Sequence, residues 1–183
     1  MRRLGAELGV EAMSLYNHVS GKSDVLDGIH EAILATMIPP RPRTDWRMAA
    51  RDLSRSFRRV LRAHPNALPV FATRPAVAKG SLRHVESALA LLRDAGFSPR
   101  DSISALQTLV TFVVGHALFQ FGRIAGAEDA EPAYAALSTD EFPRVVEAAR
   151  IMPRQGVDEE FEFGLDALVA GLELKRATGR RRR

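Results

Sequence analysis

Proline and glycine divide this sequence into segments whose apolar residues recur at helical spacing, and the alternation that marks a β-strand is nearly absent. The strongest break is the run PPRPR at residues 39–43, because proline cannot occupy a helix interior. Ser98-Pro99 is the strongest start, since a capping hydroxyl precedes a proline at the first helical position. The sequence therefore predicts an all-α fold in which residues 39–43 link two units.

The expected helices fall on both sides of this linker. Before the linker, two short helices are expected over residues 2–8 and 12–19, and Gly9 lies where a glycine that ends the first helix is expected. A third helix is expected to begin at residues 21–23 and to end near residue 37. After the linker, helices are expected over residues 44–64, 67–72, 76–95, 99–122, 141–150 and 158–175, with a loop over 124–138. We therefore expect a first unit with its linker over residues 1–43, a second unit over 44–176, and a basic tail over 177–183.

Composition excludes several classes of chemistry. The chain has no cysteine, so disulfides, thiolate catalysis and cysteine-based zinc sites are excluded. It also has no Ser-His-Asp arrangement and no phosphate-cradling glycine loop, so we expect no enzyme activity, no cofactor and no metal site. No apolar run approaches the roughly 20 residues that span a bilayer, and no signal peptide opens the chain, which favours a cytoplasmic protein. The net charge of +4 favours an acidic partner such as DNA, although the terminal residues Arg180, Arg181, Arg182 and Arg183 contribute four positive charges.

The most informative pattern lies in residues 2–22, RRLGAELGVEAMSLYNHVSGK, where a glycine turn joins two short helices. The second helix is expected to expose small, hydroxyl, amide and aromatic side chains, which suit the base edges and thymine methyl groups of a DNA major groove. The pattern alone is equally typical of a helical hairpin with a polar outer face. Residues 2–18 therefore predict a helix-turn-helix without deciding what it binds.

The same segment resembles the DNA-binding segment of the TetR family of transcriptional regulators. The residues that carry the resemblance are Ala6, Leu8, Gly9, Val10, Leu15, Tyr16, His18, Val19, Lys22, Val25 and Leu26. The resemblance implies that eight residues face a double-stranded DNA operator, namely Arg2, Ala12, Met13, Ser14, Tyr16, Asn17, His18 and Lys22. It assigns Arg2 and residues 12–14 to the bases, and Tyr16, His18 and Lys22 mainly to phosphates.

Beyond the linker, the chain resembles the tetracycline-repressor-like subgroup of that family. The matching runs are Ser56-Phe57-Arg58-Arg59, Thr73-Arg74-Pro75, Gly96-Phe97-Ser98 with Arg100-Asp101, and residues 163–168. The resemblance implies a helical domain that binds a small molecule and forms a homodimer through the helices near 99–122 and 158–175. Together with the first unit, it implies a repressor that binds a palindromic operator and is released by its ligand.

The resemblance also implies a mostly apolar pocket for a hydrophobic effector. The residues expected to line it are Leu53, Phe57, Phe71, Thr73, Arg74, Leu106, Val110 and Val113. The positions aligned with the magnesium ligands of tetracycline repressors are Phe71, Thr111 and Phe119, and none offers a carboxylate or an imidazole to a divalent cation. For any single residue of this set, plain core packing is the simpler interpretation.

The family's DNA-binding unit has three helices, and the first has no counterpart in this sequence. We therefore expect weaker DNA binding, because Leu4, Leu8 and Leu15 lose a covering partner. Two alternatives stay open: a helical dimerisation module that no longer binds DNA, and an enzyme for a lipophilic substrate, which would need a polar catalytic group in the pocket.

Two further features have competing interpretations. Six arginines line one face of the helix expected after the linker: Arg47, Arg51, Arg55, Arg58, Arg59 and Arg62. The simpler interpretation is a solvated helix face, and the alternative is a face that binds phosphate. His116 lies in the most apolar segment and is expected to be a hydrogen-bonded core or interface histidine.

Overall fold

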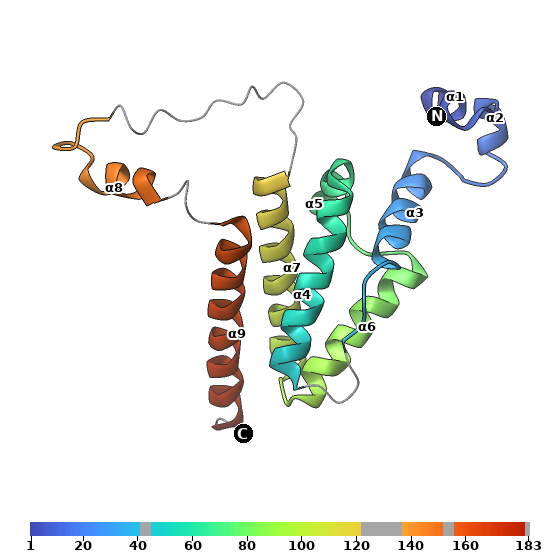
Figure 1. The fold of residues 1–183 in the computed structure, drawn as a ribbon. Helices are drawn as coiled ribbons and strands as arrows, with labels where there is room; N and C mark the ends of the chain where they lie inside the picture. The colour runs from blue at the N-terminus through green and yellow to red at the C-terminus, as the bar shows by residue number, and fades with distance from the viewer. Residues whose placement is uncertain (41–44, 122–136, 152–155, 182–183) are drawn as a thin grey trace.

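The computed structural model describes residues 1–40, 45–121, 137–151 and 156–181, and these residues form helices and turns without a β-strand. The predicted all-α fold is therefore confirmed. Three helices precede residue 41: α1 (Arg2–Leu8), α2 (Ala12–Leu15) and α3 (Lys22–Leu34). The others are α4 (Trp46–Ala63), the 3-10 turn η1 (Pro65–Ala67), α5 (Leu68–Thr73), α6 (Lys79–Asp94), α7 (Pro99–Phe121), α8 (Pro143–Ile151) and α9 (Val157–Arg181). Figure 1 shows α1 and α2 held at the far end of α3, apart from the body formed by α4, α5, α6, α7 and α9.

The helix ends follow the capping signals of the sequence. Gly9 ends α1 with a φ of 67°, in the left-handed region that favours glycine. The Asp45 carboxylate accepts the Arg47 backbone N–H at 2.9 Å and so starts α4. The Ser98 hydroxyl accepts the Asp101 N–H at 3.1 Å and starts α7. The second helix is shorter than predicted, since α2 ends at Leu15 and the backbone continues as a turn.

Helix α7 is the centre of the body and packs against α4, α5, α6 and α9. Its buried face contributes Ala105, Leu109, Val113, Val114 and Ala117 to a core that continues into the other helices. The core residues from the other elements include Phe57, Leu61, Leu68, Leu92, Phe97, Phe161, Leu165 and Val169. This burial of aliphatic and aromatic surface is the main source of stability of the body.

Length and composition alone would allow α7 to span a membrane. It has 23 residues and a mean hydropathy of 1.5 over its most apolar 18 residues, which is more apolar than the sequence led us to expect. Its position explains part of this composition, because four helices pack against it and a third of that window is buried. A helix that is apolar on several sides is expected at the centre of such a bundle.

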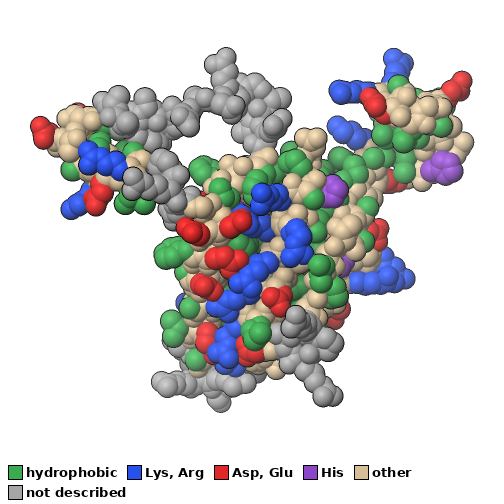
Figure 2. Space-filling view, in the orientation of Figure 1, with side chains coloured by type: hydrophobic (Ala, Val, Ile, Leu, Met, Phe, Trp, Pro, Cys, Tyr) green, Lys and Arg blue, Asp and Glu red, His purple; other side chains and the backbone are tan. Residues whose placement is uncertain are grey.

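The arginine-rich face of α4 is partly solvated and partly paired, since Arg47, Arg55, Arg59 and Arg62 are exposed and Arg51 and Arg58 are half-buried. Three close ion pairs join it to α9: Arg51–Asp166, Arg55–Glu162 and Arg58–Asp158, each at 2.7 Å. Figure 2 shows the α4 arginines as a blue band beside the red carboxylates of α9. The solvated face expected from the sequence holds for the exposed arginines, but the pairing with α9 was not predicted, because Asp166 and Glu162 lie 115 and 107 positions from Arg51 and Arg55. These three pairs favour one register of α4 against α9, although exposed ion pairs contribute little each.

Helix α8 lies to one side of the body in Figure 1. Its sequence-based range was 141–150, and the helix itself covers Pro143–Ile151. Phe142, Val145 and Ile151 leave apolar surface exposed at this helix. The expected loop over 124–138 lies almost wholly outside the described residues.

Candidate nucleic-acid interface and effector site

A close crossing of α1 and α2 shapes the predicted helix-turn-helix. Gly5 is buried, and a side chain at this position would place its Cβ 2.8 Å from the Val10 carbonyl oxygen and 3.1 Å from the Ala12 nitrogen. Only glycine allows the turn to pack so tightly against α1. Gly9 then reverses the chain in its left-handed conformation. The two glycines therefore fix the angle at which α2 is presented.

The outer face of α2 and the turn after it is open to solvent. Met13 is 72% exposed, and Tyr16, Asn17 and His18 are exposed as well. Ala12 and Ser14 are half-buried, and the Ser14 hydroxyl donates to the Glu11 carbonyl at 2.7 Å. Arg2 and Lys22 are exposed on the neighbouring helices. All eight predicted DNA-facing residues thus lie in one small unit, and six of them have exposed side chains.

The inner face of this unit is partly uncovered. Leu8 is 59% exposed and Val10 is also exposed, whereas Leu4 and Leu15 are half-buried. Apolar side chains of a two-helix unit need a further partner to leave water completely.

A carboxylate fixes the connection between α2 and α3. Asp24 accepts the Ser20 backbone N–H at 2.8 Å and the Ser20 hydroxyl at 2.6 Å. These hydrogen bonds lower the pKa of Asp24, because they favour the charged carboxylate. The direction in which α2 leaves α3 is therefore set by a local polar turn.

Three polar residues on one face of α3 attach it to the body, and we call this set the α3 latch: Asp27, His30 and Glu31. Arg74 donates to Asp27 at 2.8 Å and to the Ser23 hydroxyl at 2.6 Å. Glu31 accepts the Gly80 backbone N–H at 2.6 Å, at the start of α6, where no side chain of α6 itself supplies a cap.

The third latch residue, His30, is buried. Its Nδ1 lies 3.1 Å from the Ser81 hydroxyl, and its ring stacks on Phe71 with centroids 4.4 Å apart. Burial is the main cause that lowers the pKa of His30; Asp27 opposes this shift and Arg74 adds to it. The latch was not predicted from the sequence. Asp27, His30 and Glu31 are spaced i, i+3 and i+4, which places them on one face of a helix, and this polar face could have indicated a contact.

The predicted effector-binding residues do not all lie together. Phe57 and Val113 are buried in the core, where Phe71 and Leu106 pack against the same cluster. The Phe57 and Phe71 rings meet edge to face at 5.6 Å. Thr73 is exposed and donates its hydroxyl to the Pro69 carbonyl at 2.6 Å.

The remaining three residues of that set have other surroundings. Arg74 is engaged by the latch, Leu53 is half-buried, and Val110 is exposed. Among the described residues, no group of three acidic or histidine side chains is placed to hold a metal ion.

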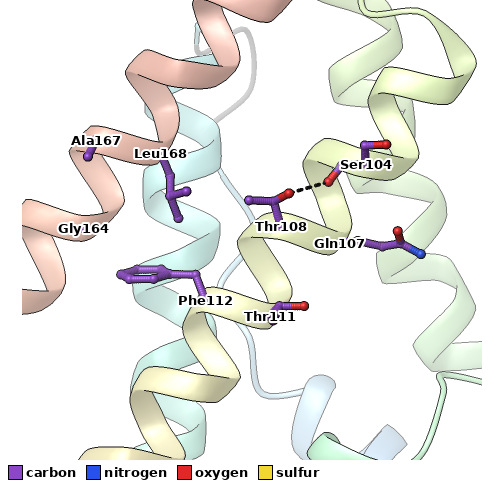
Figure 3. A pocket seen from close by; sticks show the side chains of 8 residues that line it. All are labelled: Ser104, Gln107, Thr108, Thr111, Phe112, Gly164, Ala167 and Leu168. Atoms are coloured by element: carbon purple, nitrogen blue, oxygen red, sulfur yellow. Dashed lines mark hydrogen bonds between the residues drawn. The ribbon is translucent and has the colours of Figure 1, made fainter.

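An open groove that the sequence did not predict runs between α7 and α9. Four polar residues of α7 lie along it, with apolar residues of α7 and α9 opposite; the lining residues are Ser104, Gln107, Thr108, Thr111, Phe112, Gly164, Ala167 and Leu168 (Figure 3). A Cβ at Gly164 would lie 2.6 Å from the Phe112 ring, so glycine lets the two helices approach. Phe119, Phe163 and Leu174 of the same two helices are 83%, 77% and 70% exposed. These helices thus present an apolar face that nothing in the described chain covers.

Comparison with known proteins matches most of the chain. Residues 38–176 match the family described as "Tetracyclin repressor-like, C-terminal domain". Over 182 residues the chain is 36% identical to the tetracycline repressor protein class C of Escherichia coli, an alignment that covers 97% of this chain and 82% of the relative.

Two solved structures extend the match to the fold. ActR of Streptomyces coelicolor in complex with actinorhodin has a TM-score of 0.82 at 27% identity, covering 96% of this chain and 87% of that one. A single-residue variant of TetR from Acinetobacter baumannii AYE in complex with minocycline has a TM-score of 0.76 at 30% identity, covering 96% of this chain and 83% of that one. The helical arrangement of this chain is therefore that of ligand-binding transcriptional regulators.

Proposed function

Since the chain belongs to the TetR family of transcriptional regulators, we propose that it is a repressor that binds a palindromic operator as a homodimer and is released by a small molecule. The observation that carries this proposal is the exposed face of α2, held by two glycines beside exposed Arg2 and Lys22. The proteins of this family are transcriptional regulators and not enzymes, so the alternative of an enzyme is set aside.

The reading face has the chemistry that DNA recognition requires. Met13 and Ala12 can contact thymine methyl groups, and Ser14 and Asn17 can hydrogen-bond to base edges. Tyr16, His18 and Lys22 are proposed to contact phosphates, and Arg2 to reach bases from α1. The phosphate contacts would position the unit, and the base contacts would give it specificity.

A homodimer through α7 and α9 is supported by the apolar face described above. The exposed side chains of Phe119, Phe163 and Leu174 would be costly in a monomer and are typical of a buried interface. A Cβ at Gly115 of α7 or at Gly171 of α9 would meet open space, so small residues keep this face flat enough for another helix to approach. Pairing these two helices with their two-fold mates would form a four-helix bundle and set two α2 helices about one DNA turn apart.

The α3 latch supports α3 as the connection between the two units. We propose that residues 1–43 form the DNA-binding unit with its linker, that 44–176 form the ligand and dimer domain, and that 177–183 form a basic tail. The body side of the latch lies within residues 74–81, directly after Phe71. An effector that shifts Phe71 would move Arg74 and Ser81, and through them α3.

The effector is proposed to be hydrophobic. Phe57, Phe71, Leu106 and Val113 form a continuous apolar region around the proposed pocket. The two solved relatives carry actinorhodin and minocycline, so the shared fold accommodates ligands of this kind in those proteins. We propose no magnesium chelate for this chain, because the aligned positions Phe71, Thr111 and Phe119 lack charged or imidazole groups.

The test is the dependence of DNA binding on the reading face. In fluorescence anisotropy with labelled duplexes, Lys22→Ala should weaken binding to all sequences alike and reduce the slope of log affinity against log salt by about 1. Asn17→Ala should instead change which sequences are preferred. Lys79→Ala, an exposed lysine on α6, is the matched control and should change neither. Unaltered DNA binding in both reading-face variants would contradict the proposal.

A further inference from the structure

Three buried polar atoms without a hydrogen-bond partner belong to two side chains that contact the same ring, where α4, α7 and α9 meet. Of the four such side-chain atoms in the described residues, Arg58 supplies Nε and His116 supplies Nδ1 and Nε2. Both side chains lie against Phe161: the Arg58 guanidinium carbon is 4.6 Å from the ring centroid, and the His116 ring is 5.1 Å away, edge to face. Within the described residues His116 thus has no hydrogen-bond partner, and the expected hydrogen bond stays a prediction. Buried polar atoms are normally paired, so three unpaired atoms around one ring indicate a place for a polar group.

The charge of this cluster is already balanced. Arg58 pairs with Asp158 at 2.7 Å and donates to the Val157 carbonyl at 3.3 Å, so its Nε–H is one spare donor. Burial and the neighbouring Arg58 lower the pKa of His116, while Glu160 and Asp158 of α9 oppose that shift. A neutral imidazole has one N–H donor and one acceptor nitrogen. The unpaired groups are thus two donors and one acceptor, with no charge left to neutralise.

We propose that Arg58 and His116 bind the hydroxyl group of an aromatic effector. A hydroxyl accepts a hydrogen bond from the Arg58 Nε–H and donates one to the free imidazole nitrogen, whereas a carboxylate can only accept. Phe112, Phe121 and Phe161 surround the pair and provide apolar contacts for an aromatic ring. The His116 residue is half-buried and its two nitrogens are fully buried, so the effector would reach them by displacing neighbouring side chains. This inference rests on the proposed response to a small molecule and names the group that the molecule carries.

The probes that test it are phenol, anisole and toluene, which have similar size. Phenol donates and accepts a hydrogen bond, anisole only accepts, and toluene does neither. Titrations of the full chain, labelled with ¹⁵N in the histidine rings, should show phenol shifting the His116 nitrogen signals. Because hydrogen bonds to buried partners decide the difference, phenol should bind about ten-fold or more tightly than toluene, with anisole in between.

The matched variants are His116→Phe and His84→Phe. His116→Phe removes two unpaired polar atoms and keeps an aromatic ring, so the protein should fold, and the ratio of phenol to toluene affinity should fall to about one. His84→Phe, on α6, should keep the wild-type ratio. Equal affinities in the wild type, or a phenol preference that survives His116→Phe, would overturn the inference. If only water binds to Arg58 and His116, phenol will not shift the His116 nitrogen signals, and this result would also overturn the inference.

The same samples separate this inference from the proposed repressor. DNA binding without a phenol preference would overturn the cluster and leave the repressor standing. A phenol preference without DNA binding would support the cluster and contradict the repressor.

Discussion

A buried histidine, His30, lies where α3 meets the body, and its lowered pKa leads us to expect that stability depends on pH. Burial lowers the pKa of His30 below its ordinary value of 6.5, so the unfolded chain binds a proton first as the pH falls. The stability that the neutral ring contributes is fully present above 6.5 and is lost as the pH falls toward the lower, folded-state pKa.

We predict that His30→Gln reduces the fall in Tm between about pH 7.5 and about pH 5.5, because glutamine stays neutral over this range and can still bond to Ser81. Thermal unfolding followed by circular dichroism at the two pH values measures this difference. His64→Gln, at an exposed histidine, is the control and should keep the wild-type slope. A slope for His30→Gln equal to that of the wild type would show that His30 is not responsible.

Single residues show both the reach and the limit of sequence-based prediction. The exposed face of α2 was predicted, since Met13, Tyr16 and Asn17 alternate with apolar Leu15 and Val19 in one short segment. The role of Arg74 was not, because its partner Asp27 lies 47 positions earlier and no local pattern joins them. Likewise, the sequence gives no sign that His116 and Arg58 meet on Phe161, since each comes from a different helix.

Among the elements, α6 depends on α3 for its first turn. Glu31 accepts the Gly80 N–H, and a Cβ at Gly80 would overlap the Glu31 carboxylate. We predict that Gly80→Ala displaces this carboxylate and lowers the free energy of unfolding by about 1 kcal/mol, the usual cost of losing a helix cap. Alanine also has a higher helix propensity than glycine, which would raise the stability. We expect the loss of stability to be larger, because the new Cβ would displace Glu31, which also belongs to the α3 latch.

Urea unfolding of the two proteins measures this change. Gly28→Ala, on α3 itself, is the control: a Cβ there meets open space, so the variant should be as stable as the wild type or more stable. Equal or greater stability of Gly80→Ala would contradict the capping role of Glu31.

The elements were predicted better than their partners. Helix starts at Asp45 and Ser98 and the end at Gly9 follow from local hydrogen bonding, which a short stretch of sequence contains. The ion pairs of the α4 arginines were not predicted, because the sequence does not state which helix lies beside them. Helix α2 was predicted too long, since its last residues look helical but leave the helix to form the turn before α3.

For the whole molecule, the exposed face of α7 and α9 predicts a dimer. Leu174→Arg would place a charge in the proposed interface, where it would be buried without a partner. We predict that this variant sediments as a monomer in analytical ultracentrifugation at concentrations where the wild type is a dimer. Leu82→Arg, at an exposed leucine on α6, is the control and should remain a dimer. A dimer in both variants would place the interface elsewhere.

Selection of bound duplexes from a random pool tests the central claim most directly. It is carried out with the chain as printed and with a version extended upstream by roughly 25 residues, enough for one further helix and its connection. We predict that both versions recover the same inverted repeat, with half-sites centred about 10 base pairs apart or slightly more, and that the extended version binds it more tightly. If neither version enriches an inverted repeat, the chain is not an operator-binding repressor and the central claim is contradicted.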